Sequence, residues 1–118
     1  MKASCSSFTC RSSDGKHFLG RTYDEYGDIS TNKVVVIPHN YEIKLSFTKN
    51  KENNRQTVDY ATVGMNISGF NTPFLTEGMN QEGLMGALLF FPYFSQFDTR
   101  ESLYDVNVGL LLPFVLGK

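Results

Sequence analysis

Hydrophobic and polar residues alternate along much of the chain before residue 100, and this period of two is typical of half-buried β-strands. Two alternating runs, 6–11 and 17–22, flank the sequence Ser-Ser-Asp-Gly at 12–15, which is typical of a tight turn. The pattern therefore predicts a β-hairpin near the start of the chain. A third strand is expected over 33–37, where β-branched residues follow one another until Pro38 ends the run.

Further strands are expected in the middle of the chain. Residues 41–47 alternate apolar with polar side chains, and 56–65 is interpreted as the strand that returns beside them. Two more runs, 72–76 and 84–91, flank a predicted turn at 77–82. The second of these runs does not alternate, which is typical of a strand that is covered on both faces.

A helical pattern occurs only over 100–116, and Pro113 is expected to kink or shorten that helix. Neither an internal repeat nor a low-complexity linker divides the chain. The expected fold class is α+β, with mostly antiparallel strands and one C-terminal helix. Residues 1–118 are expected to form a single domain or part of one.

Composition and charge exclude several classes of partner. The chain has 118 residues, a formal net charge of -1, 41% hydrophobic and 19% charged residues, without a basic stripe for nucleic acid. Its basic stretch, 49–55, is interpreted as a solvated hairpin tip. The longest apolar stretch, 84–91, is far shorter than the roughly 20 residues that cross a bilayer. Because 1–4 is also too short for a secretory signal, we expect a cytoplasmic protein without nucleic-acid or membrane partners.

The two cysteines are not expected to pair or to bind a metal. Cys5 and Cys10 lie in one extended run, so they are about 16 Å apart and face opposite sides. Bridged cysteines need Cα atoms within about 7 Å. His17 and His39 do not form a short ligand pair with a cysteine or with each other. Cys10 is interpreted as a small residue buried in a sheet.

Cys5 has a different potential, because removal of the leader 1–4 would make it the first residue. A free thiol titrates near pH 8.5 and an α-amine between about 7.7 and 8.0, so such an amine can take the thiol proton near neutral pH. In the chain as printed the nitrogen of Cys5 belongs to a peptide bond. The sequence is therefore interpreted as a precursor of an N-terminal nucleophile amidase.

Several short motifs in a fixed order resemble one enzyme family. They are Cys5-Ser6-Ser7, Asp14-Gly15-Lys16, Gly20-Arg21-Thr22 with Asp24, Ile37-Pro38-His39-Asn40-Tyr41, Val63-Gly64-Met65, Gly78-Met79-Asn80, and Glu82-Gly83-Leu84-Met85-Gly86-Ala87. Together they resemble the start of the choloylglycine hydrolase family, which comprises penicillin V acylases and conjugated bile acid hydrolases. The resemblance implies an N-terminal nucleophile hydrolase αββα sandwich. Because the family's members are much longer, the chain is expected to be a truncated N-terminal third.

The resemblance also implies roles for individual residues. Cys5 would be the nucleophile and, through its freed amine, the base. Arg21 corresponds to a family arginine whose positive charge favours the thiolate. Asp24 corresponds to the aspartate that hydrogen-bonds and orients the terminal amine. The family mechanism needs no cofactor and no metal.

Phe90 departs from the family pattern in an informative way. It stands where bile acid hydrolases have an asparagine and penicillin V acylases a tyrosine, so only its backbone N–H could serve as an oxyanion donor. This feature, together with Thr22, resembles the penicillin V acylases. Tyr23 and Phe90 are the expected substrate-binding side chains. The family's second oxyanion donor and second arginine lie beyond residue 118, so these residues alone are expected to be nearly inactive.

Three functions remain open from the sequence. The first is a penicillin V acylase-like cysteine amidase acting on linear carbon–nitrogen amides. The second is a conjugated bile acid hydrolase with the same mechanism. The third is a non-catalytic β-rich binding module or inactive fragment in which Cys5 has no chemical role. For the enzymes, the partner is a small-molecule amide, and the resemblance implies a homo-oligomer, with a tetramer as the candidate assembly.

Overall fold

The computed structural model describes residues 5–24, 32–45, 54–67, 70, 72–91, 96 and 106–118. Strands β1 (Ser6–Arg11) and β2 (His17–Thr22) form an antiparallel hairpin. In the turn between them Gly15 has a φ of 86°, a left-handed conformation that glycine adopts without strain. The predicted hairpin is confirmed, with both strands at the expected bounds.

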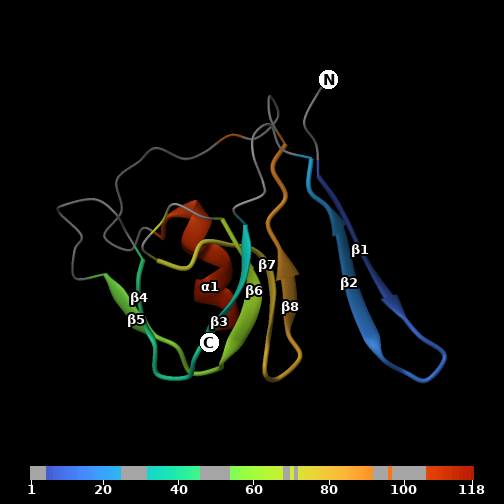
Figure 1. Cartoon of the computed structure of the whole chain (residues 1–118), viewed down its shortest axis with the longest axis horizontal. Coiled ribbons are helices and arrows are strands. Elements are labelled where there is room, and N and C mark those ends of the chain that lie inside the picture. The colour runs from blue at the N-terminus through green and yellow to red at the C-terminus, as the bar shows by residue number, and fades with distance from the viewer. Residues whose placement is uncertain are drawn as a thin grey trace.

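A four-stranded antiparallel sheet forms the centre of the molecule, and its strand order is β3-β6-β7-β8 (Figure 1). Its strands are β3 (Lys33–Ile37), β6 (Thr62–Asn66), β7 (Leu75–Asn80) and β8 (Met85–Ala87). In Figure 1 the β1–β2 hairpin stands beside the β8 edge of this sheet. The predicted strand over 33–37 is confirmed.

The remaining elements among the described residues are a small sheet and a helical segment. Strands β4 (Glu42–Lys44) and β5 (Arg55–Thr57) pair as an antiparallel ribbon. The 3-10 helix η2 (Val108–Leu110) leads directly into α1 (Leu111–Leu116), which packs against β7 and β8. Mostly antiparallel strands with one C-terminal helix confirm the predicted fold class.

The hydrophobic core lies between α1 and one face of the central sheet. Alternation along β3 turns Val35 and Ile37 toward this core, and full burial of such a side chain contributes about 1.5–3 kcal/mol. On β7 the side-chain amide of Asn80 donates a 3.0 Å hydrogen bond to the carbonyl oxygen of Leu116, which joins the sheet to the end of α1. The buried cluster consists of Ile37, Ile43, Leu45, Val58, Leu75, Leu112 and Leu116.

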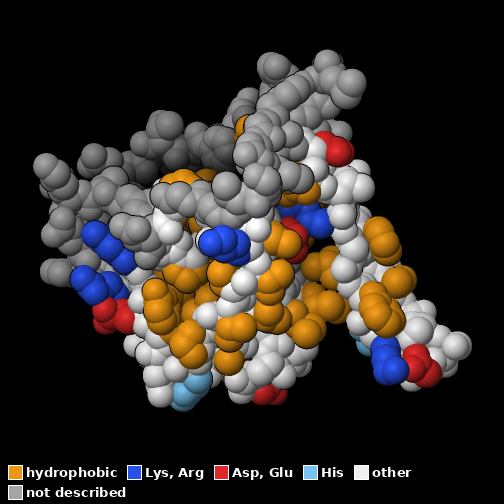
Figure 2. Space-filling view, in the orientation of Figure 1, with side chains coloured by type: hydrophobic (Ala, Val, Ile, Leu, Met, Phe, Trp, Pro, Cys, Tyr) orange, Lys and Arg blue, Asp and Glu red, His pale blue; other side chains and the backbone are white. Residues whose placement is uncertain are grey.

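The opposite face of the central sheet is apolar but exposed. Val34 and Val36 of β3, Val63 of β6 and Met79 of β7 are all exposed on it. Figure 2 shows hydrophobic side chains gathered over this sheet. A sheet with a helix on one face and an apolar second face matches one helix–sheet half of the expected αββα sandwich.

The prediction of one strand over 56–65 is wrong. Those residues form β5 and β6, which belong to different sheets. Between the two strands the backbone bends at Asp59 and Tyr60, and the N–H of Asp59 donates to the carbonyl oxygen of Gly117 at 2.7 Å. The contact with the end of α1 therefore redirects a segment whose local pattern is that of one strand.

The predicted turn at 77–82 is also wrong, because β7 continues through Glu77 to Asn80. Gly78 belongs to the strand, where a Cβ would lie only 2.8 Å from the carbonyl oxygen of Val63. The turn itself begins after Asn80, whose side-chain oxygen accepts the N–H groups of Glu82 and Leu84 at 3.1 and 2.9 Å. Glycine here serves close strand packing and not a turn.

Other boundaries are shorter than expected. Within the predicted strand 41–47 the observed strand is Glu42–Lys44. Within the predicted strand 84–91 it is Met85–Ala87. Within 100–116 the described helical residues begin at Val108, and Pro113 is the third residue of α1, where a first-turn N–H needs no helical acceptor. Pro113 therefore does not break the helix.

Candidate active site

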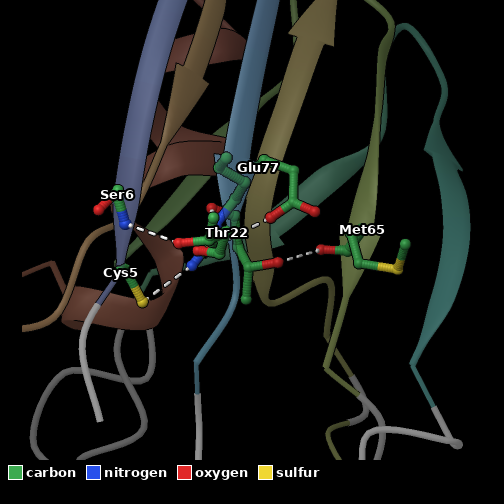
Figure 3. Close-up of polar contacts among 7 residues, drawn as sticks. Cys5, Ser6, Thr22, Met65 and Glu77 are labelled. Atoms are coloured by element: carbon green, nitrogen blue, oxygen red, sulfur yellow. Dashed lines mark hydrogen bonds and ion pairs between the residues drawn. The ribbon is translucent and has the colours of Figure 1, made fainter. Parts of the chain in front are cut away.

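Cys5 directly precedes β1 and is buried, with only 6% of the residue exposed. Its Sγ accepts a hydrogen bond of 3.1 Å from Nη2 of Arg21 (Figure 3). The hairpin register produces this contact, because Ser7 of β1 pairs with Arg21 of β2. The local turn chemistry at 12–15 thus determines which residue of β2 lies beside the thiol.

The guanidinium group of Arg21 is held from several directions, and its side chain is only 7% exposed. Nη1 donates to the carbonyl oxygen of Thr76 at 3.2 Å and to Oε2 of Glu77 at 2.9 Å. Nε donates to the carbonyl oxygen of Thr22 at 3.3 Å. The centre of the group also lies 4.8 Å from the centroid of the Tyr23 ring, at cation–π distance.

Cys5 and Arg21 lie at the wall of a cavity of about 320 Å³. Tyr23 and Phe90, the two expected substrate-binding side chains, also line it. Most of the remaining lining side chains are apolar, so the cavity suits a hydrophobic group placed next to the thiol. The remaining lining residues are Ile67, Phe74, Thr76, Leu88, Leu89, Val108 and Gly109.

Phe90 follows the central sheet at the cavity. Two residues before Phe90, the N–H of Leu88 donates to the carbonyl oxygen of Thr76 at 2.8 Å. The Phe90 residue is 45% exposed. The structure therefore brings Cys5, Arg21, Tyr23 and Phe90 together, although their chemical roles stay predictions.

Asp24 is exposed and is connected to the start of β1 through Thr22. The Thr22 hydroxyl oxygen accepts the backbone N–H of Ser6 at 3.1 Å (Figure 3), and the same hydroxyl donates to Oδ2 of Asp24 at 3.5 Å. This chain of contacts reaches the residue next to Cys5. The predicted bond from Asp24 to a freed Cys5 amine stays a prediction.

Several cavity residues were not anticipated from the sequence. Phe74 is held by its N–H, which donates to Oδ1 of Asn66 at 2.7 Å, and its ring stacks on Phe70 with centroids 4.9 Å apart. Gly109 enters the cavity wall because Asn107 caps η2 and accepts the Gly109 N–H at 3.0 Å. Asn-x-Gly before an apolar run is a helix-start signal that the continuous helix expected over 100–116 overlooked.

The predictions about disulfides and metals can be compared with the structure within the described residues. Both cysteines are free thiols there, and Cys10 is exposed on β1, so its expected burial is wrong. The reason is that both faces of the β1 strand are exposed in this part of the molecule.

No group of three or more histidine, cysteine or acidic residues that could hold a metal occurs among the described residues. Within the same residues, no helix has the length and apolarity required to span a bilayer.

Comparisons with known proteins find a matching family and related proteins. The model of the linear amide C–N hydrolases, choloylglycine hydrolase family, matches residues 5–118. The bile salt hydrolase/transferase of Clostridium perfringens (strain 13 / Type A) is 30% identical over 106 residues, which cover 88% of this chain. The crystal structure of a mutant conjugated bile acid hydrolase from Clostridium perfringens superposes with a TM-score of 0.78 at 26% identity and covers 97% of this chain.

The chain spans about a third of the length of these relatives. It covers 30% of the bile salt hydrolase/transferase and 33% of the crystallised hydrolase. The matched part includes the hairpin with Cys5 and Arg21 and the central sheet with Phe90 at its end.

Proposed function

The chain belongs to the choloylglycine hydrolase family of linear amide C–N hydrolases, and we propose that it is the N-terminal part of a cysteine amidase. The observation that carries this proposal is the 3.1 Å contact between Arg21 Nη2 and Cys5 Sγ at the wall of an apolar cavity. It joins a potential nucleophile, a fixed positive charge and room for an acyl group. The activity would belong to a longer protein.

Removal of residues 1–4 would give Cys5 a free α-amine, which takes the thiol proton. The thiolate then attacks the amide carbonyl carbon, and the tetrahedral intermediate collapses with cleavage of the C–N bond. The leaving amine departs with the proton from the Cys5 ammonium group, and a thioester remains. Water, deprotonated by the same amine, hydrolyses this thioester and regenerates the thiol.

Two neighbours would assist these steps. Asp24, connected through Thr22 to the start of β1, would orient the freed amine. The backbone N–H of Phe90 would donate to the oxyanion. One such donor contributes about 10²–10³ in rate, and the second donor expected from the resemblance lies beyond residue 118. A chain ending at Lys118 should therefore be nearly inactive.

Two acyl groups are candidates for the cavity. Tyr23, Phe74 and Phe90 give it aromatic walls that suit the flat phenoxyacetyl group of penicillin V. The similarity to a bile salt hydrolase/transferase and to a conjugated bile acid hydrolase favours conjugated bile acids instead. Both substrates are linear amides with an apolar acyl group, so the same mechanism serves either one. A cytoplasmic homo-oligomer, with a tetramer as the candidate assembly, also stays a prediction.

The proposed function is tested with the full-length protein. Intact-mass measurement should show loss of residues 1–4, and Cys5→Ala should abolish hydrolysis of both penicillin V and glycine-conjugated bile acids. Cys10→Ala is the matched control, since this exposed thiol lies on β1 and should leave most of the activity. An active enzyme that retains Met1, or an active Cys5→Ala variant, would contradict the proposed function.

A further inference from the structure

We propose that Glu77 is a positioning residue, which holds the Arg21 guanidinium in the orientation that keeps Nη2 on the Cys5 thiol. The inference rests on the proposed function, because it assigns Glu77 to the same reaction. Glu77 does not lie among the residues that line the cavity, so it would act through Arg21 and not on the substrate.

The guanidinium group of Arg21 contacts Glu77 and Cys5 through two different nitrogen atoms. Nη1 donates to Oε2 of Glu77 at 2.9 Å, while Nη2 donates to Sγ of Cys5 at 3.1 Å. Because the guanidinium is planar and rigid, the bonds of Nη1 to Glu77 and to the Thr76 carbonyl oxygen together restrict the direction of Nη2. In Figure 3 the dashed contacts of Cys5 and Glu77 illustrate this two-sided hold.

Glu77 lies on β7, an interior strand of the central sheet. Its partners across the strands are Met65 on β6 and Ala87 on β8. Met79, two residues along β7, points to the same face and is exposed on the apolar side of the sheet. Glu77 is partly buried there, and its charged partner is Arg21 of the neighbouring hairpin.

Lower exposure distinguishes the Arg21–Glu77 pair from an ordinary surface ion pair. The side chains of Arg21 and Glu77 are 7% and 29% exposed. Those of Arg55 and Glu42, which pair on the β4–β5 ribbon, are 52% and 55% exposed. Exposed pairs contribute little, whereas loss of Glu77 would leave the buried charge of Arg21 without its carboxylate partner. Glu42 therefore provides a matched control for Glu77.

Two other roles for Glu77 predict different results. Arg21 belongs to the hairpin and Glu77 to the central sheet, so the pair could serve only to join the two sheets. In that case loss of Glu77 lowers stability without changing the thiol of the folded protein. Alternatively, the carboxylate could act on the thiol through its negative charge alone, in which case its removal would make the thiolate easier to form.

The test measures how fast iodoacetamide alkylates Cys5 as a function of pH, with each cysteine quantified by peptide mass spectrometry in the full-length protein. The exposed Cys10 is an internal reference. Positioning predicts that Glu77→Ala moves the Cys5 profile to higher pH and slows alkylation about tenfold at neutral pH. Glu77→Gln, which retains an acceptor for Nη1, should restore most of the rate, and Glu42→Ala should match the unmodified protein.

Further variants keep the inference testable if Glu77→Ala does not fold. Glu77→Asp retains the charge but withdraws it by one methylene, so positioning predicts slower alkylation and a role through charge alone predicts no change. With Arg21→Ala already present, Glu77→Asp should have no further effect on the Cys5 profile. Profiles that move to lower pH in both Glu77→Ala and Glu77→Gln, or unchanged profiles with lower stability, would overturn the inference.

Failure of this inference can be told apart from failure of the proposed function. Alkylation reports on the thiol without requiring turnover, whereas hydrolysis by Cys5→Ala reports on the nucleophile. If Cys5→Ala abolishes hydrolysis but Glu77→Asp leaves the alkylation profile unchanged, the proposed function stands. Only the role of Glu77 is then wrong. Hydrolysis that persists in Cys5→Ala would remove the proposed function and the inference that rests on it.

Discussion

Gly109 lies directly against the ring of Phe74, so a Cβ at Gly109 would overlap the ring atoms. Both residues line the cavity beside Cys5, although they belong to separate described segments, 72–91 and 106–118. The absence of a side chain at Gly109 therefore determines how near η2 can approach the cavity wall. The contact also places the C-terminal segment in the candidate site.

We expect Gly109→Ala to push the Phe74 ring toward the cavity and to raise KM for an apolar acyl substrate about tenfold. Because the expected effect is steric, replacing the Phe74 ring by a smaller side chain should compensate for the added methyl group. The double variant Gly109→Ala with Phe74→Leu should recover much of the affinity. Steady-state kinetics of the full-length enzyme measure both effects, and an unchanged KM in Gly109→Ala would show that η2 shifts instead of Phe74.

Local signals in the sequence predicted the hairpin and the β3 strand correctly. Turn chemistry at 12–15 and the β-branched run before Pro38 act over a few residues, so no distant contact is needed to interpret them. The segment 56–65 differs, because its division into β5 and β6 depends on the contact between Asp59 and Gly117 near the chain's end. Such a long-range contact leaves no local signal.

The candidate site was accessible only in part from the sequence. The structure brings Cys5, Arg21, Tyr23 and Phe90 to one cavity, and their roles remain proposals. Glu77 was missed because the neighbouring glycine was interpreted as part of a turn. Had 75–80 been interpreted as a strand, Glu77 would have fallen on the same face as Met79 and stood out as a charge on an apolar face.

Asn80 connects three parts of the fold, so its truncation should be costly. Its side chain accepts two backbone N–H groups of the following turn and donates to the carbonyl oxygen of Leu116, and the residue is only 4% exposed. We expect Asn80→Ala to lower the free energy of unfolding by about 2–4 kcal/mol, because buried partners are left unsatisfied. Urea unfolding of the full-length protein measures this, and the exposed Glu82 provides a control, since Glu82→Ala should change stability by less than about 0.5 kcal/mol.

Asp14 in the hairpin turn gives a prediction about pH. The hydrogen bond from Lys16 and then that from the Ser12 hydroxyl hold the pKa of the Asp14 carboxyl below its ordinary value of 3.8. A carboxyl with a lowered folded pKa contributes stability above its ordinary value and loses it as pH falls through the folded pKa. NMR titration should therefore give a midpoint below 3.8, and Lys16→Ala should raise it. A midpoint that does not respond to Lys16→Ala would contradict the assigned cause.

Phe90 gives a prediction about substrate preference. A side chain without polar atoms at this cavity position keeps the wall apolar, and we propose that only the backbone N–H of Phe90 donates to the oxyanion. The full-length enzyme should therefore cleave phenoxyacetyl amides with a higher kcat/KM than glycine- or taurine-conjugated bile acids. Competition assays with both substrates at equal concentration measure the ratio directly.

Variants of Phe90 then separate the ring from the backbone donor. Phe90→Tyr keeps both and should change kcat/KM by less than about threefold, whereas Phe90→Pro removes the N–H and should reduce kcat about 10²-fold or more. Circular dichroism must show that the proline variant folds, because proline can also disrupt the adjoining β8 strand. If bile conjugates are cleaved at least as well as penicillin V, the preference inferred from Phe90 is wrong. The cysteine mechanism would stand in that case, because it depends on Cys5 and Arg21 and not on the acyl group.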